Sequence, residues 1–228
     1  MTTATIAAFP GEAEAGRMLR WLVMHGQNTQ SSFDFASGRM PPQSSRFGKE
    51  NLFFAILPDA EAREACLEIQ QNLREEHGPC LSPLPSERLH VSLYGVHSAA
   101  RISDDVIFAA CRAASAIEAC SFDLSFDHIT TFPLSSRNAI VLSGNGGREL
   151  LRQLHVRIGI EMHAIGCGAG VNIDFQPHAT LFYADQIIPR TRLATPVVVP
   201  VREFVLLHKR VGEAGYDHVA RWPLQNRG

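Results

Sequence analysis

The sequence predicts an α+β fold with two lobes, in which pseudo-duplicated, antiparallel-rich sheets with flanking helices enclose a central cleft. Two short segments, residues 90–93 and 178–181, share the pattern His-x-Ser/Thr-Leu, and their histidines lie 88 residues apart. The same offset aligns the apolar run at 52–54 with the one at 140–142. Each half then has the order strand, helix, turn and histidine strand, which indicates an old internal duplication and mixed strand and helix connections.

The composition narrows the class of protein. A chain of 228 residues with 45% apolar and 19% charged residues can bury the core of one domain with two lobes. The formal net charge of −2 argues against a strongly basic surface that coats nucleic acid, although a site that grips one phosphate is still compatible with it.

The cysteines and the hydropathy suggest a location. Five cysteines, an odd number without close pairs, argue against a disulfide framework and a zinc site and favour a reducing compartment. No apolar run is long enough to span a membrane, and the N-terminus lacks a signal-peptide pattern. We therefore expect a cytoplasmic protein, monomeric and without a membrane partner.

Residues 1–48 differ from the rest and are interpreted as an N-terminal extension and linker. Residues 12–25 have the apolar stripe of a helix, and residues 27–49 are rich in Ser, Gln, Pro and Gly. The extension is either a tail partly ordered on the domain or a helix that binds a partner. The folded domain is expected to span residues 51–224.

The first half of this domain opens with a buried strand at 52–57. Asp59 is then placed to cap a helix that runs to about His77 and ends before Gly78. The first histidine strand follows at about 88–96. Ser103 is expected to cap the next helix, and a strand at 122–126 alternates apolar and polar residues.

The second half repeats this order from a strand at 139–143. The glycine-rich turn at 144–147 lacks the Gly-Lys-Ser/Thr ending of a phosphate-binding loop, so a tight turn before the next helix is the expected structure. The second histidine strand is followed by strands at 197–207 and 216–223. Pro200 suggests an edge or a bend in the former.

The two histidine motifs indicate the chemistry. In a strand, residues two apart point to the same face, so His90 lies beside Ser92 and His178 beside Thr180. The pKa of an unperturbed histidine, about 6.5, allows one ring to accept a proton while the other donates one. The two hydroxyls can donate hydrogen bonds to an oxyanion, which fits a phosphoryl centre and needs no metal or cofactor. Two structural histidines are the alternative.

These paired motifs and their strand–helix spacing resemble the two-histidine (2H) phosphoesterase superfamily, and within it the 2′-5′ RNA ligase or RNA 2′,3′-cyclic phosphodiesterase family. The resemblance covers about residues 51–224. It implies a fold with two lobes, no metal, and hydrolysis of 2′,3′-cyclic phosphates of RNA ends or nucleotides to 2′-phosphates, with reversible 2′-5′ ligation in some members. By this resemblance His90 is the catalytic proton donor and His178 the catalytic acceptor, and Ser92 and Thr180 bind the phosphate.

The chain departs from the family pattern after each motif. Phe182-Tyr183 replaces the usual Ala-Arg, so a basic phosphate contact is missing there. Arg88 shares a strand face with His90 and is a candidate replacement, although an exposed arginine is the commoner case. Tyr94 and Phe182 continue the two motif rows, where they either stack on a base or pack in the core.

Two other functions are compatible with the motifs. The same cleft would serve a binding module that holds a nucleotide or phosphoester without turnover. A metal site using both histidines is less consistent with the sequence, because neither motif contains a carboxylate.

Overall fold

The computed structural model describes residues 48–134, 137–167, 170–172 and 175–226. The predicted N-terminal helix and nearly all of the predicted linker lie outside these residues. The elements in chain order are β1 (Glu50–Ile56), α2 (Ala60–His77), β2 (Ser82–Pro83), a 3-10 turn (Ser86–Arg88), β3 (Val91–Ala99), α3 (Asp104–Ala114), β4 (Phe122–Phe132), β5 (Asn138–Ser143), α4 (Arg148–Ala164), β6 (His178–Ala184), β7 (Thr191–Val201), β8 (Glu203–Lys209) and β9 (Asp217–Pro223).

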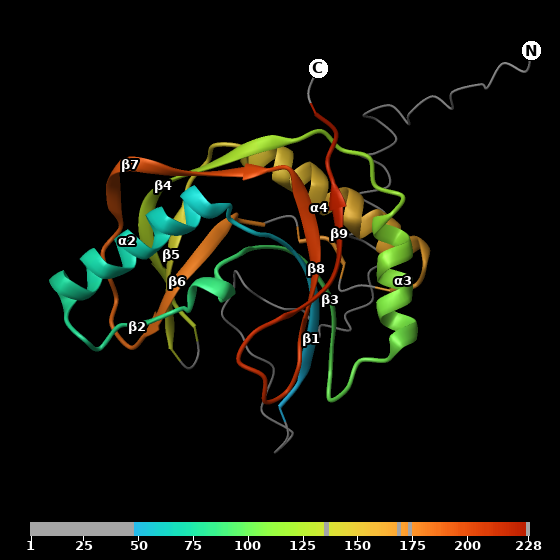
Figure 1. The fold of residues 1–228 in the computed structure, drawn as a ribbon, viewed down its shortest axis with the longest axis horizontal. Helices are drawn as coiled ribbons and strands as arrows, with labels where there is room; N and C mark the ends of the chain where they lie inside the picture. The colour runs from blue at the N-terminus through green and yellow to red at the C-terminus, as the bar shows by residue number, and fades with distance from the viewer. Residues whose placement is uncertain (1–47, 135–136, 168–169, 173–174, 227–228) are drawn as a thin grey trace, which may run out of the picture. The chain divides into compact units, whose positions relative to one another are not determined.

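The strands form one continuous sheet in the order β7-β4-β5-β6-β3-β1-β8-β9, with β2 paired to β6 (Figure 1). The pairs between these strands are antiparallel. The α+β fold with antiparallel strands is therefore confirmed, but the strands lie in a single sheet and not in separate sheets.

The two repeats meet in the middle of this sheet. The repeat β1–α2–β3 and the repeat β5–α4–β6 begin 88 residues apart, at Glu50 and Asn138, and their helices keep the same offset. Each helix is followed by a glycine with positive φ, Gly78 and Gly166. The helices cross over, since α2 packs on β6 and β7 and α4 packs on β3, β4 and α3. Each repeat therefore covers strands of the other one (Figure 1).

The helix starts follow from local chemistry. The Asp59 carboxylate accepts the backbone N–H of Ala62 at 2.9 Å, which confirms the predicted cap of α2. Ser103 stands at the N-cap of α3, but its hydroxyl makes no capping bond. Before α4, Gly147 has φ of 73°, and a Cβ there would lie 2.1 Å from the carbonyl oxygen of Asp123. Glycine is required for this approach to β4, so the segment is the expected tight turn.

The C-terminal strands differ from the prediction. Residues 197–207 belong to two strands, β7 and β8, separated at Arg202. β7 pairs with β4 at one edge of the sheet, while β8 pairs with β1 in the other half. Pro200 lies in β7, so its predicted edge position is confirmed and its missing N–H costs no inner ladder bond.

Each histidine motif ends in a bulge at its leucine. Phe54 and Ala55 pair with Tyr94 and Ser92, and Leu93 is the extra residue between them. In β6, Leu181 is the extra residue between Thr180 and Phe182. A bulge changes which face the next side chain occupies.

Tyr94 and Phe182 therefore lie in the main hydrophobic core, 3% and 0% exposed. Of the two predicted possibilities for these aromatics, the structure selects the core.

Candidate functional site

The two motifs are adjacent in the sheet. β3 and β6 pair antiparallel through Val91 and Ala179, the middle residues of the two motifs. Both side chains are buried in the main core. Because side chains alternate along a strand, the residues on either side of this pair point to the opposite face. The register thus places His90 next to Thr180 and Ser92 next to His178, with all four side chains on the face away from the main core.

His90 is held by both ring nitrogens. Its Nδ1 lies 2.8 Å from the carbonyl oxygen of Arg88, and its Nε2 lies 3.1 Å from the hydroxyl of Ser92. A carbonyl oxygen can only accept, so Nδ1 carries the proton and Nε2 of the neutral ring accepts from Ser92. The rings of Phe53 and Tyr216 pack against the imidazole at 5.3 and 5.4 Å between centroids. Nε2 is therefore the atom presented to a ligand.

His178 has the same arrangement. Its Nδ1 lies 2.9 Å from the carbonyl oxygen of Gln176, again two residues earlier in the chain. Its side chain packs edge-on against Phe132, with 5.0 Å between ring centroids. The residue is 8% exposed. Both histidines therefore direct Nε2 away from a backbone carbonyl that fixes the tautomer.

Both histidines are poorly solvated, which favours their neutral forms. The pKa of His90 is lowered to about 4, chiefly by burial and also by the charges of His178 and Arg88, against the raising effect of the hydrogen bond to the Arg88 carbonyl. Burial also lowers the pKa of His178. The free protein therefore carries two neutral rings at neutral pH, and an anion bound between them would favour protonation.

The two hydroxyls are accessible. Ser92 and Thr180 are both half-buried. Thr180 also shares a hydrogen bond with Tyr183, whose pKa is raised by burial and by Tyr216. The residue that replaces the expected arginine thus lies against one of the two candidate phosphate-binding hydroxyls.

Arg88 is the cation of this site. It is half-buried and not the exposed arginine of the commoner case, its Nε has no hydrogen-bond partner, and its guanidinium lies 5.6 Å from the centre of the Tyr216 ring. Its charge acts on both His90 and Tyr183. Within the described ranges it forms no ion pair. The sequence pointed to Arg88 through a strand face shared with His90, but this placement was wrong, because Arg88 ends a 3-10 turn and β3 begins only at Val91. No sequence signal marked Tyr216 or Phe132.

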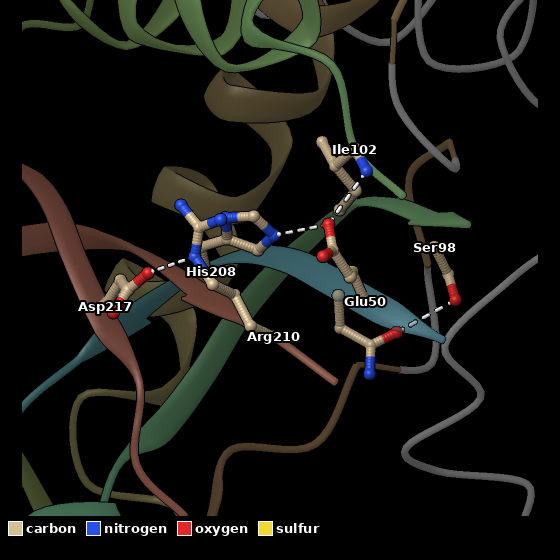
Figure 2. A network of polar contacts seen from close by, with 7 residues as sticks. Glu50, Ser98, Ile102, His208, Arg210 and Asp217 are labelled. Atoms are coloured by element: carbon tan, nitrogen blue, oxygen red, sulfur yellow. Dashed lines mark hydrogen bonds and ion pairs between the residues drawn. The ribbon is translucent and has the colours of Figure 1, made fainter. Parts of the chain in front are cut away.

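The other histidines with clear contacts have structural partners, which the sequence did not reveal. His128 bonds Asp127 at 2.8 Å. His208 is 1% exposed and bonds the carboxylate of Glu50, which also accepts the N–H of Ile102 (Figure 2). This second cluster ties β1 to β8 and to the loop after β3. Among the described residues, no group of three or more His, Cys, Asp or Glu side chains is arranged to hold a metal ion.

Two histidines at adjoining strands, each with a hydroxyl two residues later, are typical of the two-histidine phosphoesterase superfamily, and comparison with protein families agrees. The model of the 2′-5′ RNA ligase superfamily matches residues 58–213, so the chain belongs to this superfamily. No curated protein matches the chain significantly.

Solved structures share the fold. A crystal structure described as a phosphoesterase has a TM-score of 0.65 and 26% sequence identity, covering 77% of this chain and 98% of that one. E. coli LigT in complex with 3′-AMP gives 0.63 and 26%, with the same coverage of 77% and 98%. The complex of E. coli LigT with NADP+ gives 0.61 and 26%, again with 77% and 98% coverage. No helix in the described part of the chain is long and apolar enough to cross a membrane.

Proposed function

We propose that this protein is a metal-independent phosphodiesterase that hydrolyses the 2′,3′-cyclic phosphates of RNA ends or nucleotides to 2′-phosphates. The observation that carries the proposal is the pairing of Val91 with Ala179, because it sets two histidines and two hydroxyls around one point of the sheet. The nucleotide complexes of E. coli LigT support a nucleotide ligand.

The proposed reaction uses the two Nε2 atoms. His178 takes a proton from water as the water oxygen bonds to phosphorus, and His90 gives its proton to O3′ as the P–O3′ bond breaks. The product carries a 2′-phosphate and a free 3′-hydroxyl. Exchange with solvent then returns the histidines to their starting forms. The same step with an RNA 5′-hydroxyl in place of water, O3′ again leaving with the proton from His90, would give a 2′-5′ phosphodiester and a free 3′-hydroxyl, which is 2′-5′ ligation.

The remaining site residues act on the charge of the phosphate. Ser92 and Thr180 are proposed to donate hydrogen bonds to the non-bridging oxygens, which gain charge in the transition state. Arg88 is proposed to supply the cation, because its guanidinium has no carboxylate partner in the described residues and its buried Nε lacks an acceptor. A bound anion would also raise the pKa of His90 and so favour the protonated ring that the donor role requires.

The test is phosphorus NMR of the purified protein with a 2′,3′-cyclic-phosphate-ended oligonucleotide in excess chelator. Wild type is expected to yield the 2′-monophosphate. His90→Ala and His178→Ala are each expected to lose at least about 100-fold in rate, since each proton transfer contributes about 10²–10⁴-fold.

His77→Ala is the matched control, because His77 ends α2, which packs on the core face of the sheet, opposite the two motif histidines. It should keep wild-type turnover. A 3′-monophosphate product, or turnover that survives both motif substitutions, would contradict the mechanism. Nucleotide binding without any turnover would instead support a non-catalytic binding module.

A further inference from the structure

A cavity of about 290 Å³ adjoins His178 on the side away from His90's aromatic neighbours. Gln176 and Pro177 in its wall directly precede the histidine, and Phe132 in its wall packs on the imidazole. The cavity therefore lies next to the candidate catalytic centre. Its lining consists of Thr130, Phe132, Ser143, Gly144, Asn145, Arg148, Gln176, Pro177 and Arg190.

The charge of this wall is entirely positive. Arg148 and Arg190 line the cavity, and no carboxylate does. In the described part of the chain neither arginine forms an ion pair. The guanidinium of Arg148 makes a long hydrogen bond of 3.5 Å to the side chain of Asn145, and its charge also acts on Glu149, which does not line the cavity. By contrast Arg152, one turn further along α4, is held by Glu149 at 2.8 Å.

Packing explains the glycine of this wall but not its arginines. A Cβ on Gly144 would lie 2.2 Å from the carbonyl oxygen of Ser125, so this part of the loop serves the contact with β4. The two guanidinium groups come from different elements, the start of α4 and the loop before β7, and converge on one hollow. Polar side chains, Thr130, Ser143 and Asn145, supply further hydrogen-bonding groups there.

We propose that this cavity is a second phosphate subsite, which binds the phosphate on the 5′ side of the nucleoside whose cyclic phosphate lies between the two histidines. This proposal rests on the proposed function. Two arginines that form no ion pair, in a wall without a carboxylate, form a natural anion site, and arginine matches phosphate geometry through paired N–H donors. The volume suits one sugar-phosphate unit, at the lower end of ligand cavities.

The subsite would make the protein prefer substrates with a further phosphate. Adenosine 2′,3′-cyclic phosphate lacks it, the same nucleotide with a 5′-phosphate supplies a monoester, and the dinucleotide ApA 2′,3′-cyclic phosphate supplies a diester. We expect kcat/KM of wild type to be about tenfold to a hundredfold higher for a substrate that fills the subsite, as charge-assisted hydrogen bonds allow. A preference for the monoester alone would assign the subsite to nucleotides, and a preference for both would assign it to RNA chains.

The decisive variant is Arg148→Ala/Arg190→Ala. It should erase the preference while its turnover of adenosine 2′,3′-cyclic phosphate stays within about twofold of wild type. The control is Arg221→Ala, which also removes an arginine charge, but from β9, where Arg221 pairs with Glu203. Equal kcat/KM for the three substrates in wild type, or a preference that survives in the double variant, would overturn the subsite.

A binding experiment separates this proposal from the proposed function. If wild type hydrolyses none of the three substrates, the proposed function fails, and calorimetric titration with 5′-AMP and with adenosine decides the subsite alone. Tighter binding of 5′-AMP that is lost in the double variant would support it. Equal binding of the two ligands, or 5′-AMP binding that the double variant retains, would overturn it.

Discussion

The Nδ1 of His155 on α4 donates to the carbonyl oxygen of Leu93 at 2.7 Å, and Leu93 is the bulged residue of the first motif. The second motif has a matching contact, since Nε2 of Gln70 on α2 donates to the carbonyl oxygen of Leu181 at 2.8 Å. A bulge takes its extra residue out of the ladder, so its carbonyl needs another donor. Each repeat's helix provides that donor to the other repeat's motif.

Replacing Gln70 by leucine should destabilise the protein. Gln70 is 4% exposed, and its amide also donates to the carbonyl oxygen of Leu84 at 3.0 Å. Loss of this donor leaves the buried Leu84 carbonyl without that bond, at a cost of about 1–3 kcal/mol in the free energy of unfolding, read from urea denaturation. Gln71→Leu is the matched control, because Gln71 is exposed and bonds only Glu75. Equal effects of the two substitutions would contradict this role.

Stability should fall as the pH decreases from about 6.5 towards 4. The pKa values of His90, His155 and His178 are lowered by burial, so the unfolded chain binds more protons than the folded one in this window. His90 alone, with a pKa of about 4, accounts for up to about 3 kcal/mol. Carboxylates add to the loss only below about 4.5.

His155 provides the variant for this test. Its Nε2 accepts the backbone N–H of Asn172 at 3.1 Å, so protonation of the ring would break that bond. His155→Gln can keep both contacts without titrating, and its unfolding free energy should depend less steeply on pH between 6.5 and 5. An unchanged slope would show that the ring does not titrate on unfolding.

The pH optimum of hydrolysis should lie on the acidic side of neutrality. The proposed productive form has His90 protonated and His178 neutral, and the pKa of each is below the usual value of about 6.5. Because the pKa of His90 is about 4, the protonated fraction of this donor already falls above that pH, by about tenfold per pH unit, so kcat/KM should fall with increasing pH from 6.5 to 8. Initial rates at low substrate concentration in well-buffered solutions from pH 5 to 8 would measure kcat/KM. An optimum above pH 7 would contradict the assignment of His90 as proton donor and His178 as acceptor.

Arg88→Met should distinguish the effect of the guanidinium charge from that of side-chain packing, because methionine keeps a long unbranched side chain without the charge. Loss of the phosphate contact is expected to lower kcat/KM by about tenfold to a hundredfold. The same change removes a positive charge that disfavours protonation of His90, so the pKa of His90 should rise. Histidine NMR titration would detect that rise, with Arg221→Met as the charge control on β9. An arginine with only a packing role would leave the pKa of His90 where it is.

Local pattern predicted the repeat and the motif faces well. Short sequence patterns predicted the helix cap at Asp59 and the edge position of Pro200. The 88-residue offset was visible because each repeat carries its own copy of such patterns. The fates of Tyr94 and Phe182 were not, because a bulge depends on pairing with a distant strand and reverses the alternation beyond it.

Convergence of distant residues was the other feature hidden from the sequence. Arg148 and Arg190 come from separate elements and meet because β4 pairs with β5 on one side and with the start of β7 on the other. The split of residues 197–207 at Arg202 has the same cause, since β7 and β8 pair with strands at different places in the sheet. Both features depend on strand pairing between distant residues, which local sequence patterns do not contain.

The single residue pair Val91–Ala179 gives the sheet a seam, and the candidate site lies across it. A phosphate bound by side chains of both β3 and β6 would add contacts between the half of the sheet that contains β3 and the half that contains β6. Ligand binding would then stabilise the folded protein, so the melting temperature should increase with nucleotide concentration. Local unfolding at the β3–β6 pair should be slower or rarer in the complex. Hydrogen exchange at the motif amides would thus report occupancy as directly as a binding assay.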